Sequence, residues 1–108
     1  MRIRLTITLL TAIVALGPVF NGSGSEAFIS EIVAANNKTL KDEFGETSDW
    51  VELHNPGNTP ANLLGWGLSD ELETPLKWIF PDVSIPPGKF LIVHASGNNI
   101  AEPGKPLH

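Results

Sequence analysis

The feature that most constrains the fold is an alternating segment, residues 50–54, followed at once by a run of turn-forming residues, 55–60. In an extended strand successive side chains point to opposite faces, so Val51 and Leu53 share one face and the residues between and beside them share the other. The turn run contains proline, which fixes φ, and glycine and asparagine, which tolerate positive φ. We therefore predict a strand that ends at His54 and buries Val51 and Leu53.

Four more segments have the apolar and β-branched composition of strands. The first, residues 28–34, does not keep one clean alternation, so we expect a bulge there or burial on both faces. Residues 65–70 and 76–80 predict a hairpin across the turn 71–75, and residues 90–95 form a nearly continuous apolar run. The whole pattern predicts an all-β chain.

Large apolar residues are needed because the domain is small and has no cysteine for disulfides. Trp66 and Trp78 are expected in the core, whereas Trp50 lies on the face opposite Val51 and is our candidate for a ligand-binding ring. The predicted core residues are Val51, Leu53, Trp66, Leu68, Trp78, Phe80, Leu91 and Val93.

Several blocks in order carry a family resemblance: E-I-V-A-A-N, D-W-V-E-L-H-N-P, L-L-G-W-G-L-S-D, K-W-I-F-P and I-P-P-G-K-F-L-I-V. From Phe28 to the end, the chain resembles the lamin tail domain, an immunoglobulin-like module of nuclear lamins and of secreted bacterial proteins. The secreted bacterial type fits better, since no heptad-patterned coiled coil precedes the domain. The resemblance implies an immunoglobulin-like β-sandwich and a non-catalytic interaction module.

Domains of this family usually continue past a Leu-His pair like Leu107-His108 into two or three further strands. We therefore expect residues 28–108 to be a lamin-tail-like domain that lacks its last strands.

Residues 1–27 have the order of parts of a secretory signal peptide: a basic start, an apolar run at 5–16, a Gly-Pro break and small residues. Ser25-Glu26-Ala27 favours cleavage before Phe28, with cleavage near 23–25 as the alternative. The apolar run is shorter than the roughly 20 residues of a membrane span. We expect a secreted or cell-surface protein with no membrane span after cleavage.

The chain has 7 basic and 12 acidic residues, and removal of residues 1–27 takes two arginines and Glu26, which leaves 5 basic and 11 acidic residues and a net charge of −6. The remaining lysines are scattered along the sequence. Nucleic-acid binding requires clustered Lys and Arg, so we do not expect it.

A polar loop holds the best candidate metal ligands, because a hard cation such as Ca²⁺ prefers several oxygen ligands on a flexible turn. The alternative is a solvated acidic loop, and we expect no cofactor other than this candidate Ca²⁺. The candidate ligands are Asp42, Glu43, Glu46 and Asp49.

No residue pattern predicts an enzyme. His54 is expected on the outer face of its strand and His94 in a partly buried position, and neither has the spacing of a metal pair or a triad. Glu52 is expected to be exposed or to pair with a lysine such as Lys77 on a neighbouring strand.

The sequence thus favours a non-catalytic, secreted interaction module that binds a protein or a cell-envelope component. Two alternatives stay open. The chain is the front of a larger secreted enzyme, with a kinase-like spore-coat-protein-H domain or a hydrolase domain, or it is a Ca²⁺-dependent adhesion domain.

Overall fold

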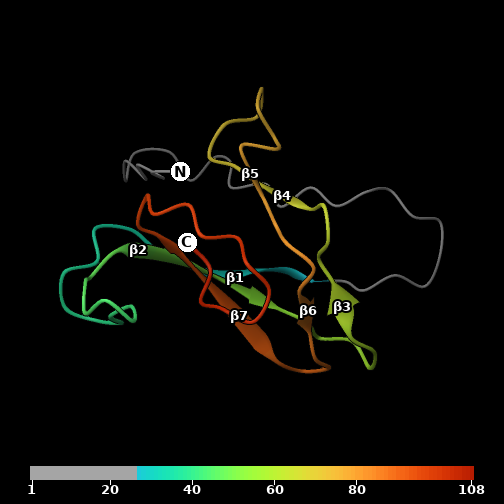
Figure 1. The fold of residues 1–108 in the computed structure, drawn as a ribbon. Helices are drawn as coiled ribbons and strands as arrows, with labels where there is room; N and C mark the ends of the chain where they lie inside the picture. The colour runs from blue at the N-terminus through green and yellow to red at the C-terminus, as the bar shows by residue number, and fades with distance from the viewer. Residues whose placement is uncertain (1–26) are drawn as a thin grey trace.

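The computed structural model describes residues 27–108, and this part of the chain is all-β with seven strands and no helix (Figure 1). The immunoglobulin-like β-sandwich class predicted from the sequence is thereby supported. The predicted signal peptide, apart from Ala27, lies outside the described residues. The strands are β1 (Phe28–Val33), β2 (Asp49–His54), β3 (Ala61–Asn62), β4 (Gly67–Leu68), β5 (Trp78–Ile79), β6 (Ser84–Ile85) and β7 (Phe90–Ala95).

The first layer is an antiparallel sheet of order β1-β2-β7, in which β2 is central. Its pairing with β7 is regular from Asp49 opposite Ala95 to His54 opposite Phe90. Val51 is fully buried on the inner face, as predicted, because it faces the second layer from the middle of the sheet.

Strand β1 contains a bulge. Its pairing with β2 shifts between Ile29 and Glu31, so Ser30 is an extra residue in the ladder. Ile29 stands opposite the buried Leu53 and packs against the core, while Phe28 and Glu31 both lie on the outer face. The bulge expected in this segment is confirmed.

The second layer is an antiparallel ribbon built from residues 61–68 and 78–85. Strands β3 and β6 pair at one end and β4 and β5 at the other. Between them, the N–H of Leu63 donates to the carbonyl of Val83 over 2.8 Å, and the N–H of Phe80 donates to that of Trp66 over 2.9 Å. The predicted hairpin between residues 65–70 and 76–80 is confirmed as the β4–β5 end of this ribbon.

The inner faces of the two layers form the core, and six of the eight predicted core residues are at most 3% exposed. Trp66 and Leu91 pack on the core but are only partly buried. Trp66 follows Gly65, which has a φ of +77°, so it leaves a turn instead of standing within a strand. Leu91 lies on the edge strand β7. The fully or nearly fully buried residues among the predictions are Val51, Leu53, Leu68, Trp78, Phe80 and Val93.

Asn55, directly after β2, joins the two layers. Its side chain is fully buried. The Nδ2 amide donates to the carbonyls of Thr59 (2.7 Å) and Ile85 (2.9 Å), and Oδ1 accepts from the N–H of Gly57 (2.9 Å). One amide therefore closes the turn 55–60 and ties the end of β2 to β6.

Replacement of Asn55 by Ala is expected to lower the free energy of unfolding by about 3 kcal/mol, because the buried carbonyl of Ile85 and the part-buried carbonyl of Thr59 and N–H of Gly57 all lose this partner. Urea denaturation followed by tryptophan fluorescence would measure the change. Asn62→Ala is the matched control, since its amide bonds Asp82 and Ser84 at an exposed site. We expect it to cost less than about 1 kcal/mol, and equal losses in the two variants would contradict this view of Asn55.

Candidate functional site

The outer face of the sheet, turned away from the ribbon, has a closed end and an open end. At the closed end Trp50 stands opposite Val33 on one side and His94 on the other. Trp50 and His94 are only 9% and 8% exposed. The exposure predicted for Trp50 is therefore wrong. Val33, Trp50 and His94 lie at the end of the sheet where the loop 36–48 and the tail 96–108 come together.

The loop 36–48 is held by its own polar side chains. The backbone N–H of Asn36 donates to the carboxylate of Asp49 (3.0 Å), and the side-chain amide of Asn36 donates to the carbonyls of Leu40 and Ser48. Asp42 is buried, and its Oδ1 accepts from the N–H groups of residues 44 and 46 at 3.0 and 2.9 Å. The side chains of Asn36 and Asp42 therefore hold the conformation of a loop that has no regular secondary structure.

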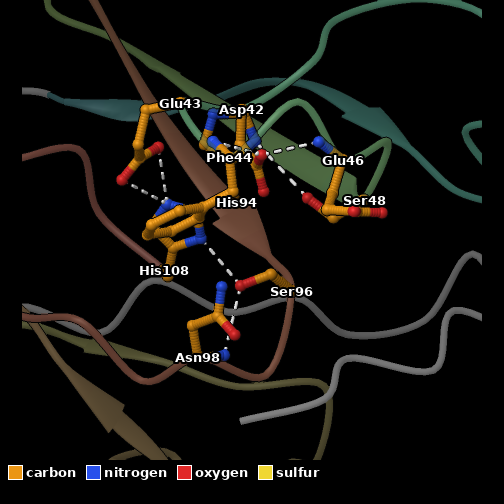
Figure 2. A network of polar contacts seen from close by, with 9 residues as sticks. All are labelled: Asp42, Glu43, Phe44, Glu46, Ser48, His94, Ser96, Asn98 and His108. Carbon is orange, nitrogen blue, oxygen red and sulfur yellow. Dashed lines mark hydrogen bonds and ion pairs between the residues drawn. The ribbon is translucent and has the colours of Figure 1, made fainter.

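His108 joins the tail to this loop, as Figure 2 shows. Its imidazole is buried, with Nδ1 at 2.7 Å from Oγ of Ser96 and Nε2 at 3.0 and 3.1 Å from the carboxylate oxygens of Glu43. An ionised carboxylate only accepts, so the Nε2–H of His108 donates to Glu43. We call Glu43, Ser96 and His108 the His108 clasp.

The clasp also supports β7. The backbone N–H of His94 donates to the carbonyl of Leu107 over 2.8 Å, and Leu107 forms a parallel bridge with Val93. The His94 and His108 rings stack with centroids 5.1 Å apart and an interplanar angle of 24°. The clasp thus holds the tail along the strand and the loop over the tail.

Serine, histidine and carboxylate are the parts of a nucleophilic relay, but this geometry favours a structural role. The side chain of His108 has no exposed surface, so a substrate has no approach to it. Ser96 Oγ is also occupied by the N–H of Asn98 at 3.1 Å.

Burial shapes the electrostatics of this cluster. Desolvation lowers the pKa of His94 below its ordinary value of 6.5, and the positive charge of a protonated His108 lowers it further, against the smaller attraction of Asp42 and Glu43. For Glu43, burial acts to raise the pKa, but hydrogen bonds from the backbone and from His108 outweigh it and the pKa is lowered.

We expect the melting temperature to fall as the pH drops below 6.5. The unfolded chain binds a proton on His94 near 6.5, whereas the folded chain binds it only at lower pH. Stability from neutral His94 is therefore fully present above 6.5 and is lost progressively below it. Circular dichroism melts across this range should show a shallower loss for His94→Gln, with His54→Gln as the control, and an unchanged slope in His94→Gln would contradict the assignment.

The four carboxylates proposed as calcium ligands are used separately. Asp42 caps backbone N–H groups of its own loop, Glu43 belongs to the clasp, and Asp49 binds the N–H of Asn36. No hydrogen bond or ion pair of the Glu46 carboxylate is found among residues 27–108. In this described part of the chain, no three His, Asp or Glu side chains form a group that could hold a metal ion.

Addition of Ca²⁺ is accordingly expected to leave the melting temperature unchanged, since a ligand raises stability only when it binds the folded state. Differential scanning fluorimetry with and without Ca²⁺ measures this directly. A rise in melting temperature that the double variant Asp42→Asn, Asp49→Asn abolishes would establish a calcium site.

The open end of the outer face carries an aromatic row, Phe28, His54 and Phe90. These residues lie directly opposite one another on β1, β2 and β7. His54 stacks on Phe90 with centroids 4.3 Å apart and 12° between the planes, and Phe28 meets His54 edge to face at 5.6 Å. Phe28 and Phe90 are 48% and 55% exposed.

Beside the aromatic row lies an acidic pair, Glu31 and Glu52, directly opposite each other on β1 and β2. The predicted pairing of Glu52 with Lys77 is wrong, because Lys77 forms ion pairs with Asp70 and Glu71 instead. Sequence reasoning missed the row and the pair, because the neighbours of β2 and their register were unknown.

Comparison with protein-family models matches residues 21–106 to the Lamin Tail Domain. Comparisons with curated proteins and with solved structures find no match. Within residues 27–108 there is no helix with the length and hydropathy that crossing a membrane requires.

Proposed function

Since the chain belongs to the lamin tail domain family, which is immunoglobulin-like and non-catalytic, we propose that it is an exported module that binds another protein or a cell-envelope component. The open end of the outer face is its binding surface. The buried position of His108 in the one serine-histidine-carboxylate cluster found among residues 27–108 supports a binding role over a catalytic one.

The exposed aromatic row is the observation that carries this proposal. Two phenylalanines that are about half exposed flank a histidine on a sheet face, although each would gain by burial. Contiguous apolar surface of this kind is typical of protein interaction sites. Phenylalanine is also among the residues that are enriched in protein interfaces relative to the rest of the surface.

Export is proposed from the basic, apolar and small-residue order of residues 1–27. The absence of cysteine is compatible with export, because apolar packing in the core and the hydrogen bonds of Asn55 hold the two layers together without disulfides. The acidic charge of the domain favours a protein or envelope partner over a nucleic acid.

A photoreactive phenylalanine derivative at position 90, introduced in the natural host, is expected to form a discrete cross-linked product in the exported fraction. The same derivative at Leu64 is the matched control, since Leu64 has similar exposure, 57% against 55%, but belongs to the second layer. Equal cross-linking at the two positions, or none at position 90, would contradict the proposed binding surface.

A further inference from the structure

We propose that the partner is an extended, basic segment of another protein, with a lysine or arginine that binds between Glu31 and Glu52 and an apolar side chain that packs on the aromatic row. This inference rests on the proposed function and adds the chemistry of the partner. It follows from the arrangement of charge and apolar surface on the open end.

The acidic pair is the first observation. Two carboxylates directly opposite on neighbouring strands repel each other and destabilise a sheet. The hydroxyl of Ser30 donates a hydrogen bond to Oε1 of Glu52 over 2.8 Å and so stabilises the charge of Glu52, but not that of Glu31. No lysine or histidine in residues 27–108 forms an ion pair with either glutamate. A cation supplied by a partner would remove the repulsion.

Apolar side chains lie next to the acidic pair, so the surface offers both charged and apolar contacts to a partner. Ile92 lies opposite Glu52 on β7, so the acidic pair continues across the sheet into an apolar side chain. The aromatic row lies two residues further along β2, about 7 Å away. Carboxylates, an aliphatic group and ring edges therefore share one strip of surface.

The spacing specifies the partner. Residues i and i+2 of an extended chain point to the same side about 7 Å apart, which equals the separation of the aromatic row from the acidic pair. An extended segment with Lys or Arg two residues from an aromatic or aliphatic residue therefore meets both. Arginine gains additional energy because its guanidinium group stacks on aromatic rings.

A second copy of the chain is the less favourable occupant. Residues 28–108 carry a formal net charge of −6, so two copies repel each other. Lys77 and Lys105 are already engaged with acidic neighbours of their own chain. A basic partner is attracted by the same charge.

The test uses the exported protein and a random library of displayed 12-residue peptides. Peptides that bind the wild type but not Phe90→Thr should contain Lys or Arg two residues from an aromatic or aliphatic residue. A synthetic peptide of this kind should bind the double variant Glu31→Gln, Glu52→Gln at least about tenfold more weakly, and high salt should weaken wild-type binding.

The matched control is Glu73→Gln, Glu102→Gln, which has the same charge change elsewhere on the molecule and should bind like the wild type. Melting curves of each variant show that it is folded. Neutral or acidic selected peptides, or equal affinity in the Glu31/Glu52 variant, would overturn this inference and leave the proposed function standing. If no selected peptide depends on Phe90, both fail, and a dimer that Phe90→Thr dissociates would identify a second copy as the occupant.

Discussion

The sandwich depends on the buried amide of Asn55. A three-stranded sheet and a two-stranded ribbon share only a small core, and the turn 55–60 must return the chain from one layer to the other. Asn55 satisfies carbonyls in the turn and on β6 and an N–H in the turn, all from one side chain. Its backbone N–H and C=O also pair with Lys89 and Gly88, next to β7. Asn55 thus connects the end of β2 to β6 in the second layer and to the start of β7 in the first. The positions of these three strands along their axes therefore depend on one another.

The same sheet serves two purposes on its outer face. At one end, the His108 clasp and the loop 36–48 lie beside Trp50 and His94. Both of these side chains are buried, so this end has a structural role. At the other end, Phe28 and Phe90 remain half exposed. Hydrogen bonds and packing at the closed end hold the same strands in place, and an aromatic row on strands that are already ordered loses little conformational entropy when it binds a partner. Structural and interaction roles are therefore separated along the strand direction.

The sequence predicted local structure well because the signals were local. Alternation around Val51, the turn after His54 and the turn between the two later strands each lie within a few residues, and all were confirmed. The exposure of Trp50 was wrong because a loop and tail distant in sequence come together at its end of the sheet. The His108 clasp joins positions 43 and 108, and no pattern in the sequence identifies such a pair. The aromatic row required the strand order, which a single sequence does not contain.

One extra residue in β1 decides which side chains appear on the outer face. With strict alternation, Phe28 and Glu31 would point to opposite sides, and the bulge at Ser30 places them together. Deletion of Ser30 would leave a regular ladder in which Phe28, Ile29 and Glu31 keep their present faces, whereas a strand that kept Ser30 but lost the bulge would turn Phe28 inward and Ile29 outward. In evolutionary terms, a single codon can be gained or lost at this position without erasing the recognition surface, provided that the strand absorbs the extra residue as a bulge, so descendants of this fold can differ in length here and keep one specificity.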